Sequence, residues 1–100
     1  MDFIAKFIKN PRIKLESLTL YNNNICDEGA IALAEAFYDH EYIRVINLQM
    51  NFIRDIGASY FVDGVAENAF KNIQKIVLVE NQCSERLKRY VKNTAPLVMV

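Results

Sequence analysis

The sequence predicts an α/β fold in which a strand-plus-helix unit repeats about three times. Three segments align with one another: LESLTLYNNNIC from Leu15, IRVINLQMNFIR from Ile43 and IQKIVLVENQCS from Ile73. The stretches DEGAIALAEAF and DIGASYFVDGV, which follow the first two segments, suit helices. Because strands joined by helices lie parallel, we expect a short solenoid, with a parallel β-sheet on its concave face and α-helices on its convex face.

Each aligned segment carries the same five positions. Aliphatic residues hold the first, fourth and sixth places, asparagine the ninth, and an apolar or sulfur residue the eleventh. The segments begin 28 and 30 residues apart. The positions are Leu15, Leu18, Leu20, Asn23 and Ile25, then Ile43, Ile46, Leu48, Asn51 and Ile53, then Ile73, Ile76, Leu78, Asn81 and Cys83.

This pattern, L-x-x-L-x-L-x-x-N-x-L, is the signature of leucine-rich repeats. With its repeat length and a full helix after the strand, the chain resembles the ribonuclease-inhibitor-like class of leucine-rich-repeat proteins over residues 13–92. That class includes the Ran GTPase-activating proteins, the tropomodulin carboxy-terminal domain and the sensor domains of nucleotide-binding immune receptors. The resemblance implies a short leucine-rich-repeat solenoid, as a single domain over residues 1–100.

Residues 1–12 are predicted to form a helix that caps one end of the array. Phe3, Ile4, Phe7 and Ile8 make one apolar helical stripe, and Asn10–Pro11 breaks the helix. Lys6 and Lys9 beside this stripe suit a membrane-surface helix as an alternative. The cap is the preferred interpretation, because the end of the core would otherwise be exposed.

The remaining elements follow the repeat. Residues 13–42 and 43–72 are the first two repeats, and residues 73–93 are a third that ends in a charged capping helix over 84–93. Ser84 is its expected N-cap, and Pro96 ends the segment. The tail, residues 94–100, includes LVMV, which suits either a fourth edge strand or pairing with a second chain.

The expected strands, 17–21, 45–49 and 75–79, have two faces with different uses. Leucine and isoleucine of the repeat point into the core, and the alternate residues point outward. We expect the outward face to bind a partner through Tyr21, Val45, Asn47, Gln49, Val77 and Val79. Asn23, Asn51 and Asn81 are expected to be buried and to stack as a ladder, because their amides can both donate and accept bonds in the turns.

Composition disfavours several classes of function. The chain has 12 basic and 12 acidic residues, and this zero net charge disfavours nucleic-acid binding. No apolar run is long enough for a membrane span and no secretory leader is visible, so we expect a cytoplasmic protein that does not bind membranes. Cys26 and Cys83, 57 residues apart, suit buried thiols in a reducing compartment.

Catalysis and cofactor binding are not expected. His40 is the only histidine, its neighbours Asp39 and Glu41 lie too close in sequence to converge on a metal, and a solvated loop is its preferred interpretation. With only three glycines, the chain has no phosphate-binding loop. We therefore expect no metal, no cofactor and no enzymatic activity.

Three functions remain. The first is a protein-interaction module that binds a protein partner through the concave sheet face. The second is a structural protein that self-assembles as a homodimer through the terminal strand edge. The third, a regulator of a small GTPase, is implied only by the resemblance to the Ran GTPase-activating proteins.

Overall fold

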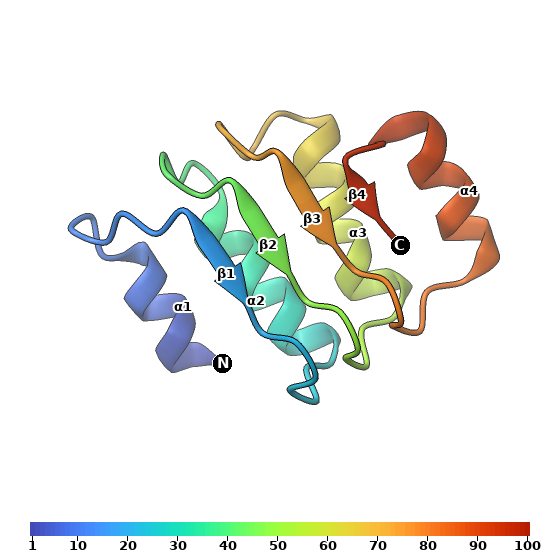
Figure 1. The fold of residues 1–100 in the computed structure, drawn as a ribbon, viewed down its shortest axis with the longest axis horizontal. Coiled ribbons are helices and arrows are strands. Elements are labelled where there is room, and N and C mark those ends of the chain that lie inside the picture. The colour runs from blue at the N-terminus through green and yellow to red at the C-terminus, as the bar shows by residue number, and fades with distance from the viewer.

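The computed structural model describes all 100 residues and has an α/β architecture (Figure 1). The elements are α1 (Asp2–Lys9), β1 (Ser17–Thr19), α2 (Asp27–Phe37), β2 (Val45–Asn47), α3 (Asp55–Ala66), β3 (Lys75–Val77), α4 (Glu85–Thr94) and β4 (Val98–Met99). All four strands lie parallel in one sheet, in the order β1-β2-β3-β4. The prediction of an α/β fold with a parallel sheet is confirmed.

The helices leave one face of the sheet open. In Figure 1, α2 and α3 lie behind the sheet, α1 and α4 lie beyond its two edges, and no helix crosses in front of the strands. The ladder continues past the short strands, because Asn22 N donates to Gln49 O at 3.1 Å and Met50 N donates to Val79 O at 3.2 Å. The tail adopts the first of its two expected arrangements, with β4 pairing along β3.

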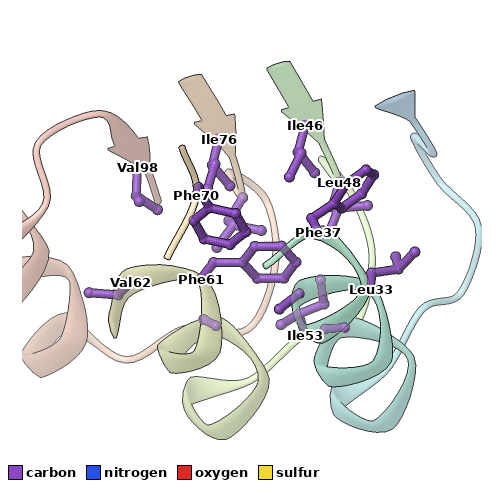
Figure 2. Packing of buried hydrophobic residues seen from close by; sticks show 14 of the residues in the cluster. Leu33, Phe37, Ile46, Leu48, Ile53, Phe61, Val62, Phe70, Ile76 and Val98 are labelled. Carbon is purple, nitrogen blue, oxygen red and sulfur yellow. The ribbon is translucent and has the colours of Figure 1, made fainter. Parts of the chain in front are cut away.

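The core lies between the sheet and its covering helices (Figure 2). The repeat residues Ile46, Leu48, Ile76 and Leu78 supply its sheet side, fully buried. The helices supply Leu33, Phe37, Phe61 and Val62. Repeat periodicity therefore places isoleucine and leucine in the same layer of the core at equivalent strand positions of the second and third units, whereas Leu18 and Leu20 of the first unit are only partly buried.

Phe70 is a core residue that the repeat pattern does not identify. Its ring stacks on Phe61, with centroids 6.2 Å apart, and meets the edge of Tyr38 at 5.2 Å. Gly64 makes room for it, since a Cβ there would lie 2.5 Å from the Phe70 ring. The loop after α3 is thus anchored by an aromatic cluster rather than by a repeat position.

The amino-terminal stripe divides between the core and solvent, which corrects its expected burial. Ile8 is fully buried and Ile4 is half-buried against the core. Phe3 is 82% exposed and Phe7 is 51% exposed. Only one side of α1 therefore acts as a cap. No helix in the structure has the length and apolar character that crossing a bilayer requires.

Asparagine side chains join successive turns. Asn51 Oδ1 accepts from the backbone N–H groups of Asn23 and Ile25, at 2.8 and 2.9 Å. Its Nδ2 donates to the carbonyl oxygens of Leu20 and Leu48. Asn81 repeats this arrangement one unit later, accepting from Ile53 N at 2.9 Å and donating to Leu48 O and Leu78 O.

Asn23 differs, and its expected burial is wrong. Its side chain is exposed, and its Nδ2 donates only to Tyr21 O, at 2.9 Å. The physical reason is its position, because each of the other asparagines serves the turn that precedes it along the sheet. No such turn lies before the first repeat.

A second ladder, formed by aspartates, runs along the helix starts. Asp27 Oδ1 accepts from Arg54 N at 2.7 Å, and Asp55 accepts from Ser84 N at 2.7 Å and from Ser84 Oγ at 2.5 Å. The Ser84 bonds hold the pKa of Asp55 below its usual range. Ser84 Oγ in turn caps α4 by accepting from Leu87 N.

Candidate functional site

The surface that the helices leave open is the candidate functional site. Its side chains come from alternate positions of the strands and their extensions, and we call it the outer sheet face: Ser17, Thr19, Tyr21, Val45, Asn47, Gln49, Lys75, Val77, Val79 and Met99. All six residues that the sequence assigned to partner binding lie in this set. The other four, Ser17, Thr19, Lys75 and Met99, were not among the predicted contact residues.

The row at the strand ends carries the most exposed aromatic side chain of this face. Tyr21 is 49% exposed, and Gln49 and Val79 follow it at equivalent places in the next two units. Gln49 Nε2 donates to Glu80 Oε1 at 2.8 Å. The row therefore offers a ring, an amide already engaged with a carboxylate, and a half-buried aliphatic group.

The middle row corrects one predicted contact residue. The strand register aligns Thr19, Asn47, Val77 and Met99 across all four strands. Val77 is only 7% exposed, whereas Met99 is 43% exposed. Because neighbouring strands lie about 4.8 Å apart, the side chains on both sides cover Val77. Met99 takes the accessible position that the sequence assigned to Val77.

A side-chain hydrogen bond and a repeated turn geometry position the strand ends of this face. Asn47 Oδ1 accepts from Gln49 N at 2.9 Å, which ties the middle row to the end row. The next residue in each unit has a left-handed backbone, with φ of 56° at Asn22, 58° at Met50 and 58° at Glu80. Three equivalent residues thus share one turn geometry, which favours asparagine or glycine over the methionine and glutamate present.

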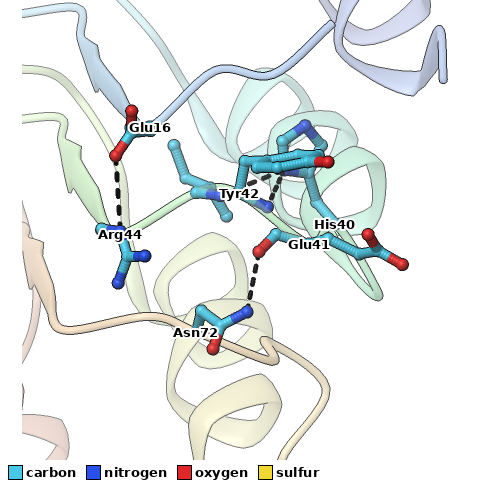
Figure 3. Close-up of polar contacts among 7 residues, drawn as sticks. Glu16, His40, Glu41, Tyr42, Arg44 and Asn72 are labelled. Atoms are coloured by element: carbon cyan, nitrogen blue, oxygen red, sulfur yellow. Dashed lines mark hydrogen bonds and ion pairs between the residues drawn. The ribbon is translucent and has the colours of Figure 1, made fainter. Parts of the chain in front are cut away.

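The loops at the other end of the strands hold the only histidine (Figure 3). His40 Nδ1 accepts from the N–H groups of Tyr42 and Ile43, at 3.3 and 3.2 Å. Its Nε2 is buried without a partner, and burial lowers the pKa of His40. His40 lies in a loop as expected, but it is partly buried rather than fully solvated, because its ring accepts bonds from the turn.

Two further contacts tie these loops together. Arg44 pairs with Glu16 across the first two strands at 3.4 Å, and Asn72 Nδ2 donates to Glu41 O at 2.7 Å (Figure 3). No group of histidine, cysteine, aspartate or glutamate side chains is arranged to hold a metal ion. The contacts at this end of the strands therefore serve to hold the loops in place.

The two cysteines lie in different environments. Cys83 is half-buried at its repeat position, and burial together with nearby Asp55 raises its pKa to about 11. Cys26 is exposed at the N-cap position of α2, so its expected burial is wrong. It lies one residue beyond the buried Ile25, where the chain has already turned outward.

The aspartate ladder and Phe70 are the residues that sequence reasoning missed. A signal for the aspartates was present, because Asp27 and Asp55 begin the two matching stretches 28 residues apart. Both aspartates accept from a backbone N–H of the following unit, and no side-chain pattern reveals such a partner. Phe70 occurs in only one unit and gives no periodic signal.

Comparison with known protein families finds no family that matches this chain, and comparison with curated proteins finds no related sequence.

Proposed function

We propose that this chain is a leucine-rich-repeat protein of the ribonuclease-inhibitor-like class that binds a protein partner through the outer sheet face. The class is supported by the 28- and 30-residue spacing and by the asparagine bonds that link successive turns. In this proposal the open sheet is the concave surface of a short solenoid. The chain acts by binding and not by catalysis.

One observation carries the binding proposal: exposed apolar side chains lie on a sheet face that no helix covers. Tyr21 and Met99 are exposed there, and Val45 and Val79 are partly exposed. These groups do not contribute to the core on the other side of the sheet. Apolar groups rimmed by polar ones mark interaction surfaces, and tyrosine is enriched among interface anchors.

The polar groups of the face suit a protein more than a nucleic acid. Ser17, Thr19 and Asn47 are uncharged, and Lys75 is the only basic residue of the set. Phosphate backbones require several cations at the contact. A polypeptide surface with its own apolar anchor and hydrogen-bonding groups complements this mixture.

The proposal is tested by site-specific photocrosslinking in native extracts. A photoreactive amino acid at position 21 should give a discrete crosslinked protein, and the same group at Ile56 on α3 should not. Ile56 is a matched control because it is 67% exposed on a helix away from this face. The captured protein is then purified and its affinity for the chain is measured directly.

Paired substitutions complete the test. Tyr21→Ala with Val79→Ser removes one ring and one branched side chain from the outer sheet face, and we expect the affinity to fall at least about tenfold. Tyr60→Ala with Ile56→Ser removes the same groups from α3 and should leave the affinity unchanged. Equal affinities for both double variants would exclude the outer sheet face as the binding surface.

Self-assembly through the terminal strand is the second candidate. The far edge of β4 has no strand beside it, which favours pairing with a second copy. However, β4 has only two residues, and the hollow of about 400 Å³ beside it has a net positive lining, with Lys88, Arg89 and Lys92 against Glu85. Two copies would bring these cations together, so the homodimer stands behind the binding module.

A further inference from the structure

The first helix presents aromatic side chains that the fold does not use. Phe3 is the most exposed large hydrophobic residue of the molecule, and Phe7 lies one turn further along the same side of α1. Ile4 and Ile8 attach the helix to the core. The packing of α1 on the core therefore uses only the isoleucines of the apolar stripe and leaves both phenylalanine rings exposed.

Basic residues outnumber acidic ones in the amino-terminal segment, with Lys6 and Lys9 on α1 and Arg12 and Lys14 in the loop after it, where Lys14 Nζ lies 5.8 Å from the centre of the Tyr42 ring. Residues 1–14 contain one acidic residue, Asp2, and four basic residues, Lys6, Lys9, Arg12 and Lys14. The two ion pairs of the molecule, Glu16–Arg44 and Glu85–Lys88, involve none of them. This end therefore has a local excess of positive charge, as α4 has with four basic residues and one acidic residue, but only α1 combines this charge with two exposed phenylalanine rings.

We propose that α1 binds the surface of an anionic lipid bilayer. Phe3 and Phe7 enter the boundary between headgroups and acyl chains, and the four basic side chains contact lipid phosphates and carboxylates. Both interactions strengthen membrane binding by a short amphipathic helix, because aromatic groups favour this boundary and each cation is attracted to the negative surface. The helix lies on the membrane and does not cross it.

The combination of groups favours a lipid surface over a second copy of the chain. A protein surface must match two neighbouring rings with a pocket and four cations with placed carboxylates. A fluid anionic bilayer offers an apolar region to the rings and negative headgroups to the cations, and it needs no matching shape. This inference is independent of the proposed function, because α1 lies outside the outer sheet face and leaves it free for a partner.

A single reporter tests the contact. The chain has no tryptophan, so Phe3→Trp introduces a unique fluorophore at the proposed insertion point. Vesicles of phosphatidylcholine and phosphatidylserine in equal amounts should shift its emission to the blue, and phosphatidylcholine vesicles should not. High salt should weaken the shift, because it screens the attraction to the surface. Tyr90→Trp on α4 is the exposed control and should not shift.

Sedimentation with the same vesicles separates the two contributions. Phe3→Ser with Phe7→Ser should lower the partition coefficient at least about tenfold, because apolar burial is lost. Lys6→Glu with Lys9→Glu should lower it by a similar factor, about tenfold or more. Arg86→Glu with Arg89→Glu makes the same charge change at the opposite end of the molecule and should leave binding unchanged. Circular dichroism verifies that each variant is folded.

Three outcomes would overturn the proposal. Wild-type protein that does not sediment with the anionic vesicles contradicts it directly. Equal loss of binding in the α4 control means that net charge, and not α1, causes adsorption. A blue shift of the Phe3→Trp emission that grows with protein concentration in the absence of vesicles means that the rings contact a second copy.

Discussion

Asn51 and Asn23 hold the same position in consecutive repeats, yet only Asn51 stabilises a turn other than its own. Asn51 is 4% exposed, and its amide joins the first turn to the second. Asn23 is exposed, and its side chain bonds only within its own turn. The difference shows that the repeat asparagine acts on the preceding unit, so identical sequence positions contribute unequally to stability.

Removing the central amide is expected to have the largest effect. Asn51→Ala leaves buried N–H and C=O groups of two turns unpaired, and we expect a loss of about 3 kcal/mol in the free energy of unfolding. Asn23→Ala is the matched control and should cost less than about 0.5 kcal/mol. Denaturant melts measure both changes, and equal losses would contradict the directional role of the asparagine.

Gly29 and Gly57, in the first turns of α2 and α3, also hold equivalent positions that should contribute unequally to stability. A Cβ at Gly57 would lie 2.6 Å from Asp27 Oδ1 and 2.9 Å from Asp27 Cα, where the first repeat packs against the second. At Gly29 the nearest atom is a side-chain carbon of Ile25, at 3.1 Å. We expect Gly57→Ala to cost about 2 kcal/mol through overpacking.

The matched variant makes the comparison decisive. At Gly29 the closest contact is the Ile25 methyl at 3.1 Å, which Gly57 matches with Ile53, and the closer Asp27 contacts are absent. Alanine also favours a helix, so Gly29→Ala should cost well under Gly57→Ala. Thermal melts of both variants provide the measurement. A larger loss at Gly29 would mean that contact between the first two repeats does not limit the space at Gly57.

Acid should weaken the loop end of the strands through His40. Its lowered pKa means that His40 binds fewer protons in the folded state than in the unfolded state. The stabilisation that neutral His40 gives is therefore present above the pKa it has in the unfolded state. That contribution is lost as the pH falls through the folded pKa, because protonated Nδ1 cannot accept from Tyr42 and Ile43. Stability should therefore decline as the pH drops below about 6.5.

A substitution that does not titrate isolates this effect. His40→Asn retains an acceptor oxygen near the position of Nδ1, so the turn should persist without titration. We expect its urea midpoints to vary less between about pH 6.5 and 5 than those of the wild type, above the range where most carboxylates titrate. Parallel pH profiles would show that His40 is not the titrating group.

The smallest expected effect concerns the left-handed turn position. Met50 adopts φ 58° where the first repeat has Asn22, and asparagine tolerates this conformation better than methionine does. Met50→Asn should therefore raise the free energy of unfolding by about 0.5 kcal/mol. Met50→Leu retains the unfavourable conformation and should show no gain. A gain with leucine would attribute the effect to packing.

Sequence periodicity predicted the parts of this molecule that depend on neighbours along the chain. Leu48 and Ile76 were assignable to the core because strand alternation fixes which face each side chain takes. The same alternation placed Tyr21 and Gln49 on the open face. These assignments require only the local register of each strand.

Features set by lateral packing could not be predicted in this way. Val77 points to the open face, but its burial depends on β4, whose pairing the sequence left undecided. Phe3 and Phe7 share a stripe with Ile8, and only the angle at which α1 meets the core decides which of them is covered. Periodicity fixes the side of an element, whereas exposure depends on what lies next to it.

The direction of the asparagine bonds has a consequence for the timing of folding during synthesis. The first turn emerges from the ribosome before Asn51. The backbone N–H groups of that turn, at Asn23 and Ile25, donate to the Asn51 amide oxygen. The turn at Asn51 likewise precedes Asn81, which accepts from Ile53. Each nascent unit must therefore wait for about one further repeat, a delay of a few seconds at ordinary elongation rates. We expect the first turn to reach its native conformation only after Asn51 has left the exit tunnel, and the second only after Asn81 has left it.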